Sequence, residues 1–176
     1  MKKVLLMYAL YTQQANEKVL QLLDKLSPEE RNRDRKSYYK SLTGLAQHNI
    51  GSILFFHGLM RPVLPESKAL AGTAKLQMPD SDTLDTGQWA QLKDIAKQTD
   101  QATVELLQSL SEEDLNQLLP IDWYGGNPAC VPLHYLLNIA MVHGVHHRGQ
   151  ISQILDTMGI DNDFSGIDVG FFFVME

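Results

Sequence analysis

The feature that most constrains the fold is the spacing of apolar side chains over long stretches of the chain. Between Val4 and Leu26 they recur at steps of three and four residues, which is the period of an α-helix. Further long helices are expected from about Lys36 to Met60, from about Thr86 to Leu110 and from Pro132 to about Met158. Four long helices with no convincing run of strands predict an all-α protein, a four-helix bundle.

The connections between these helices carry turn signals. The stretch from Arg61 to Thr86 is rich in Pro, Ser, Asp and Gly, and predicts a loop with one short helix near Ser67–Leu76. The stretch from Leu118 to Val131 breaks the helical period and could hold a short hairpin. The sequence contains no internal repeat and no linker, so residues 1–176 are predicted to form a single domain.

Size and charge exclude several classes of function. A chain of 176 residues buries enough surface to fold without a disulfide or a metal, so a bound metal would serve chemistry. The net charge of −6 argues against a nucleic-acid partner. The apolar run after Lys2 and Lys3 is too short to span a membrane and lacks a cleavage site. The single cysteine, Cys130, is expected to be a buried, inert thiol, and we expect a cytoplasmic protein.

The histidines of the last helix differ in the direction they face. At about 100° per residue, His147 falls within the apolar stripe of this helix and His143 at its edge. His146 and His134 fall outside the stripe and are expected to face water or a subunit contact. Because His143 and His147 are four residues apart, their ring nitrogens can converge on one metal ion.

Two histidines do not make a metal site, and the third ligand must come from another helix. In the second helix, His48 faces the edge of the core, whereas His57 lies on the opposite side. His48 alone could be a core histidine bonded to a backbone carbonyl. Three inward histidines from two helices favour a metal centre instead, because bundle interiors are where facing helices build such sites.

The run from Asn138 to Gln150 resembles the hallmark helix of the DinB/YfiT-like family of metalloenzymes. In that helix a histidine is followed four residues later by His-Arg-Gly-Gln, here His147 to Gln150, and His48 fits the upstream histidine of the family. The resemblance covers nearly the whole chain. It implies the family's own bundle connectivity, often as a homodimer, and a divalent metal, zinc or nickel, held by His48, His143 and His147.

The remaining motif residues have expected roles near this site. Gln150 lies on the metal side of the helix and could orient a metal ligand or bound water by a hydrogen bond, or could simply be a polar residue of the helix surface. Arg148 is expected to cap neighbouring carbonyls or to bind an acid. Gly144 and Gly149 each cost about 1 kcal/mol relative to alanine inside a helix, and close helix approach would explain both.

A homodimer is also expected from the residues themselves. One ground is the apolar tail around Phe171–Phe173, which one bundle can hardly bury entirely. The other is a second apolar face on the second helix, shared with His57, which could form a dimer contact: Ala46, Ile50 and Ile53.

Three functions remain open. Characterised relatives include thiol-dependent enzymes, so the resemblance implies a metal-dependent S-transferase that joins a low-molecular-weight thiol to a small electrophile. The second is a metal-dependent hydrolase, which needs a carboxylate base such as Glu17. The third is a non-catalytic metal-binding stress protein, whose closed site would need His146 or His57 as a fourth ligand.

Overall fold

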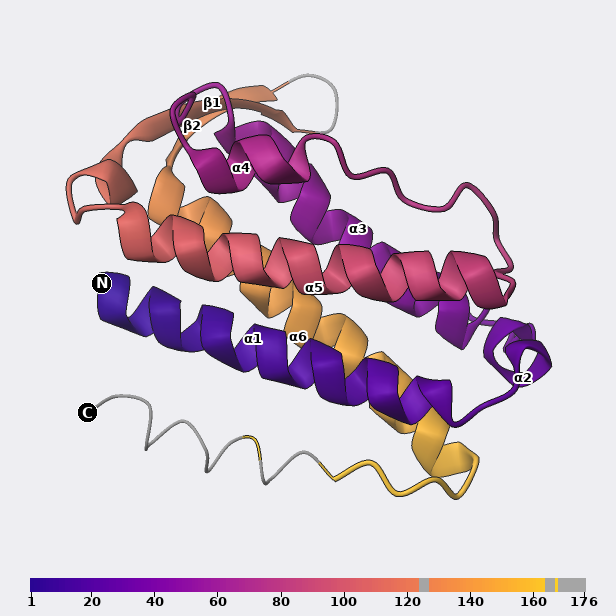
Figure 1. Ribbon diagram of the computed structural model, residues 1–176. Helices are drawn as coiled ribbons and strands as arrows, with labels where there is room; N and C mark the ends of the chain where they lie inside the picture. Colours follow the sequence, from indigo (N-terminus) through magenta and orange to yellow (C-terminus); the bar gives the residue numbers. More distant parts are fainter. Residues whose placement is uncertain (124–126, 164–166, 168–176) are drawn as a thin grey trace.

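The computed structural model describes residues 1–123, 127–163 and 167, and four long helices dominate this part of the chain (Figure 1). They confirm the prediction of an all-α four-helix bundle. The long helices are α1 (Lys2–Asp24), α3 (Leu42–Met60), α5 (Thr86–Ser109) and α6 (Leu133–Thr157). Shorter helical segments connect them: α2 (Pro28–Asn32), α4 (Lys68–Thr73) and the 3₁₀ turn η1 (Asp114–Asn116).

The long helices pack in two neighbouring pairs. Helix α1 runs alongside α5, and α3 packs against α6 behind them, while α6 also contacts α1 and α3 also contacts α5 (Figure 1). The predicted hairpin is present as β1 (Leu118–Trp123) and β2 (Asn127–Pro132), antiparallel, with Leu118 opposite Pro132. None of the described helices is long and apolar enough to cross a membrane.

The start of α3 differs from the sequence prediction. We expected this helix from about Lys36, but it begins at Leu42, after a loop over residues 33–41. Lys36 and Lys40 have φ angles of 57° and 61°, which a right-handed helix cannot accommodate. Ser41 then caps the helix, because its hydroxyl accepts a hydrogen bond from the Gly44 N–H. The backbone turn over residues 33–41 therefore sets the direction of the side chains in this loop.

The core consists of two apolar clusters with a polar layer between them. The first cluster lies towards the hairpin and includes Phe56, Leu106 and Leu137. The second lies towards α2 and includes Leu23, Leu45 and Trp89. Residues midway along all four long helices separate the clusters, and several of them are buried polar groups: Asn16, Asn49, Asp100, His147 and Arg148.

Hydrogen bonds in this polar layer join the four long helices. Arg148 of α6 donates to the side-chain oxygen of Asn16 on α1 over 2.9 Å, and the Asn49 amide of α3 donates to the same oxygen over 3.2 Å. The Asn16 amide in turn donates to both carboxylate oxygens of Asp100 on α5 at 3.0 Å. Asn16 is thus the shared partner through which α1 contacts the other three helices.

The two glycines of α6 have different surroundings. A Cβ atom at Gly144 would lie 2.9 Å from Arg148 Nη1 and 3.3 Å from Asn49 Oδ1, so the polar layer needs a glycine here. This agrees with the close approach that we expected. At Gly149 an added Cβ would meet no described atom within 4 Å, so close packing among the described residues does not explain that glycine, contrary to the prediction.

The apolar face of α3 that we assigned to a dimer contact is buried inside the chain. His57 is only 1% exposed, and its ring nitrogens contact the hydroxyls of Thr73 at 3.3 Å and Thr103 at 3.0 Å. The prediction failed because α4, α5 and α6 all pack on α3, so this helix is enclosed on more than one face. The other members of that face are buried as well: Ala46, Ile50 and Ile53.

The other ground for a dimer, the Phe171–Phe173 tail, lies outside the described residues, so the homodimer stays a prediction. The expectation for Cys130 was wrong, because its side chain is exposed. It pairs with Pro120 on the outward face of the hairpin, whereas the flanking position Leu119 is buried. Alternation along a strand therefore places the thiol on the outside.

We predict that Gly144→Ala destabilises the protein whereas Gly149→Ala stabilises it. Both changes gain up to about 1 kcal/mol of helix propensity. At Gly144 this gain is outweighed by the forced displacement of the buried Arg148 guanidinium, since overpacking costs about 1–3 kcal/mol. Urea unfolding monitored by circular dichroism measures both changes. Equal stabilisation by the two substitutions would contradict the close packing described for Gly144.

We also predict opposite pH dependences from two buried groups. Burial lowers the pKa of His57 to about 4, so the unfolded chain binds the extra proton between about pH 6.5 and 4, and the free energy of unfolding falls on acidification. Burial raises the pKa of Asp100 to about 7, so its folded form holds a proton that the unfolded chain releases, and stability rises on acidification.

Asp100→Asn removes the second effect and leaves the first. Urea unfolding at pH 7.5, 6 and 5 in EDTA should therefore show a steeper acid loss of stability in this variant than in the wild type. Parallel pH profiles of the two proteins would show that Asp100 does not exchange a proton on unfolding.

Candidate metal centre

Three histidines converge between α3 and α6. His48 comes from α3, and His143 and His147 come from successive turns of α6. The Nε2 atom of His143 lies 3.0 Å from that of His48 and 3.1 Å from that of His147. One potential ligand atom from each ring lies within 4.8 Å of the others. The structure thus brings together the three histidines that the sequence singled out, and such a group could hold a metal ion.

A hydrogen bond sets the tautomer of His147. Its Nδ1 atom lies 2.7 Å from the side-chain oxygen of Gln150, which can only accept a hydrogen bond. The ring proton is therefore on Nδ1, and Nε2 presents a lone pair towards the other two histidines. An outward N–H bonded to an oxygen is the usual arrangement of a metal-ligating histidine.

The environment keeps all three rings neutral. Burial, followed by the proximity of His147 and His143, lowers the pKa of His48 to about 4. Burial also lowers the pKa of His143 and of His147, and the neighbouring His146 adds to the effect. Because a metal ion binds the neutral imidazole, these rings are ready to act as ligands at neutral pH.

Two hydroxyl groups flank the cluster. The Tyr39 hydroxyl lies 2.9 Å from His48 Nε2, and the Tyr39 ring stacks on the His48 ring with centroids 4.1 Å apart. The Ser52 hydroxyl lies 3.0 Å from His143 Nε2 and donates its proton to the His48 carbonyl oxygen over 2.6 Å. Both residues were missed as site residues. Ser52 could have been identified from the sequence, because it lies four residues after His48 on the same helix. Tyr39 could not, because the segment that contains it was expected to be helical.

The other three histidines do not join the group. His57 is buried against Thr73 and Thr103 on α4 and α5. His146 is exposed, in agreement with the helical wheel, although its ring lies 4.9 Å from that of His147. His134 is half-buried in the first turn of α6. Within the described chain, the cluster therefore holds three imidazoles and no carboxylate or thiolate.

The donor set fits a divalent cation. His143 Nε2 faces His48 Nε2, His147 Nε2 and the Ser52 oxygen, yet a neutral ring offers at most one proton to share among them. A cation accepts a lone pair from every ring at once. The spacings of 3.0 and 3.1 Å between nitrogens are also near the value of about 3.4 Å for two ligands of a tetrahedral zinc. Three protein ligands leave a position open for another molecule.

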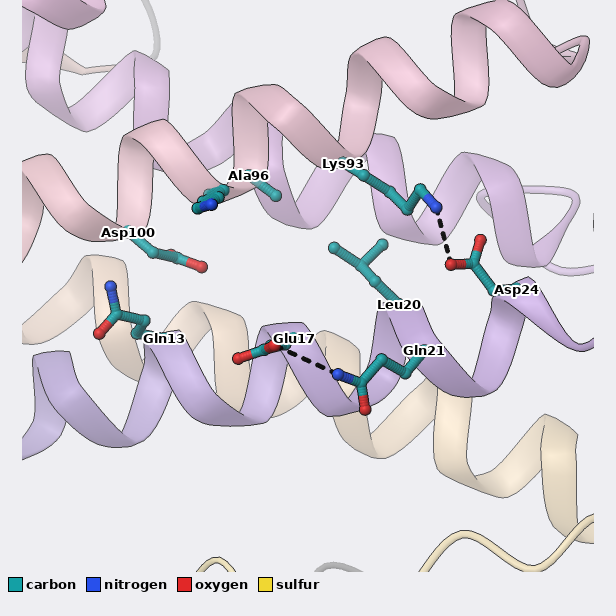
Figure 2. Close-up of a pocket in the computed structure, with 9 residues that line it drawn as sticks. Gln13, Glu17, Leu20, Gln21, Asp24, Lys93, Ala96 and Asp100 are labelled. Atoms are coloured by element: carbon teal, nitrogen blue, oxygen red, sulfur yellow. Dashed lines mark hydrogen bonds and ion pairs between the residues drawn. The ribbon is translucent and has the colours of Figure 1, made fainter.

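Two cavities lie at different positions relative to this cluster. One of about 410 Å³ lies beside it and is lined by Tyr39, together with Lys40, Gln47 and Asp82. The other, of about 300 Å³, lies between α1 and α5 (Figure 2). None of the three histidines lines either cavity, but Tyr39, which lines the first, contacts His48.

Glu17 belongs to the second cavity. It accepts a hydrogen bond from Gln21, and the ion pair between Lys93 and Asp24 spans the same cavity at 2.7 Å (Figure 2). Asp100 lines its buried side and is bonded to Asn16. The carboxylate that we considered as a catalytic base therefore lies in a cavity separate from the histidines.

Comparisons with known proteins agree with this fold. A DinB-like protein, YjoA from Bacillus subtilis, has a crystal structure that matches with a TM-score of 0.61 and 21% identity over 89% of this chain and 96% of that one. A DinB-like protein from Bacillus cereus matches with a TM-score of 0.54 and 21% identity over 85% and 89% of the two chains. No curated protein sequence matches.

The family comparison covers the whole bundle. The DinB family model matches residues 1–164, which include every long helix and all three clustered histidines. The resemblance that the His-Arg-Gly-Gln sequence indicated is thereby confirmed. This chain belongs to the DinB family.

Proposed function

We propose that this protein is a metal-dependent transferase that joins a low-molecular-weight thiol to a small electrophile. His48, His143 and His147 hold the divalent ion, zinc or nickel. The observation that carries the proposal is the convergence of three neutral imidazoles with no carboxylate in the described cluster. This donor set leaves room for a substrate sulfur.

A divalent ion held by these histidines would lower the pKa of a coordinated thiol, so that the thiol would release its proton to solvent and be available as thiolate at neutral pH. Residues of the chain prepare the site for this step. Gln150 fixes the His147 ring through Nδ1, and Ser52 bonds the His48 backbone one turn earlier. The thiolate sulfur would form a bond to the electrophilic carbon without a further base, and the leaving group of the electrophile would depart as an anion. The lack of a carboxylate in the described cluster therefore suits sulfur transfer.

The residues that we considered for the two alternative functions lie outside the histidine cluster. A hydrolase of this kind normally uses a carboxylate base beside the metal, and Glu17 lines the other cavity. A purely structural metal would be closed by a fourth protein ligand. His57 is buried elsewhere and His146 is exposed, so neither is placed to close the site.

We predict that one divalent metal binds per chain and that His147→Ala loses it. The matched control is His134→Ala, which removes a histidine from the same helix outside the cluster. Inductively coupled plasma mass spectrometry of the purified proteins gives the metal content. We expect about one ion per wild-type or His134→Ala chain, and at least a tenfold lower content in His147→Ala. Equal metal content in the two variants would overturn the assignment of His147 as a ligand.

We predict that the metal-loaded protein accelerates conjugation of a low-molecular-weight thiol to an electrophile such as chlorodinitrobenzene. His143→Ala should abolish this rate while the far-ultraviolet circular dichroism stays helical, since the two apolar clusters do not depend on the ion. The rate should fall in acid as protons displace the metal. Because the pKa of His48 is lowered to about 4, this loss should occur well below pH 6.5.

The controls for this assay are the metal-free protein and a set of ester and amide substrates. Conjugation at the same rate without metal would contradict a role for the three histidines. Turnover of esters or amides without turnover of any thiol would favour the hydrolase instead.

A further inference from the structure

The backbone that carries Tyr39 is held tightly against the first turn of α3. The Ser41 N–H donates to the Tyr39 carbonyl oxygen over 2.6 Å. A Cβ atom at Gly44 would collide with the same carbonyl oxygen, so this close approach requires a glycine. Lys36 and Lys40 take left-handed φ angles on either side of Tyr39. The hydrogen bond, the close approach at Gly44 and the two left-handed residues therefore fix the position of the Tyr39 side chain.

The Tyr39 ring lies over the face of the His48 ring. The two ring planes are 25° apart with centroids 4.1 Å apart, and Tyr39 meets the His147 ring edge-on at 89°. The Tyr39 hydroxyl thus reaches His48 Nε2 from the ring face, at 2.9 Å. A metal ion binds an imidazole nitrogen in the ring plane, along its lone pair. Tyr39 can therefore stay in place beside an ion held by the three histidines.

The two hydroxyls near the cluster differ in what they can donate. Ser52 gives its single proton to the His48 carbonyl oxygen, so towards the site it can only accept. The Tyr39 hydroxyl lies 2.9 Å from a ring nitrogen whose lone pair a metal would take, so that nitrogen would then no longer accept a hydrogen bond from it. Tyr39 also lines the cavity of about 410 Å³ beside the cluster. Tyr39 thus lines this cavity and also contacts His48 through its hydroxyl.

We propose that Tyr39 positions the molecule that takes the open place beside His48, His143 and His147, by donating a hydrogen bond from its hydroxyl. This inference rests on the proposed metal centre and adds a specific residue to it. The group that accepts the hydrogen bond is an anion or a sulfur that can also bind a divalent ion. Tyr39 acts as a positioning residue, and the three histidines hold the ion without it.

The test uses the full-length protein loaded with Co²⁺, whose visible absorption reports on the ligands. Tyr39→Phe keeps the aromatic ring and removes the hydroxyl. Tyr135→Phe, at an exposed tyrosine of α6, is the matched control. Each protein is titrated first with Co²⁺ and then with two probes, 2-mercaptoethanol and azide. A hydrogen bond to a charged group is worth about a tenfold change in affinity.

We expect the three proteins to bind Co²⁺ with affinities within about threefold of one another. We expect Tyr39→Phe to bind each probe about tenfold more weakly than the wild type, and Tyr135→Phe to bind it equally well. Unchanged probe affinity in Tyr39→Phe overturns the role of Tyr39 and leaves the metal centre standing. Failure of all three proteins to bind Co²⁺ overturns both. Azide binding with the expected loss, but no binding of the thiol, supports Tyr39 and overturns the thiol transferase.

Discussion

The hydrogen bond from Arg148 to Asn16 is the interaction on which the arrangement of this bundle depends. The guanidinium is buried midway along α6, with 5% of the side chain exposed, where an uncompensated charge would be strongly destabilising. Asn16 accepts from it and from Asn49, and donates to the Asp100 carboxylate. One amide on α1 therefore forms hydrogen bonds with polar groups from α3, α5 and α6. These contacts fix the rotation of α3 and α6 about their own axes.

That rotation determines where the histidines point. Asn49 follows His48 directly on α3, and Arg148 follows His147 on α6, so each helix presents a network residue and a cluster residue at adjacent positions. Neighbouring residues on a helix point about 100° apart. When Asn49 and Arg148 turn towards α1, the histidines beside them turn towards each other. The apolar clusters on either side stabilise the bundle, and the polar layer sets the register in which they pack.

Local patterns allowed the four long helices and the inward histidine pair to be predicted, because the helical period depends only on residues a few positions apart. On α3 the wheel placed His48 correctly but failed for the face with His57, since neighbours enclose this helix on several faces. It also gave no sign of the loop at 33–41, whose shape depends on Lys36 and Lys40 in unusual backbone conformations. The polar layer could not be inferred either, because Asn16 and Arg148 are 132 positions apart.

A likeness at 21% identity carries the fold and no more, so the comparison does not extend to the side chains around the three histidines. Gln150 sets the tautomer of one ring, and Ser52 and Tyr39 place hydroxyls beside the others. No carboxylate belongs to the described cluster, and Glu17 lines another cavity. Such surroundings can orient a bound molecule by hydrogen bonds but offer it no strong base. With the proposed metal bound, a nucleophile that ionises through the metal alone would suit this site better than one that must first lose a proton to the protein.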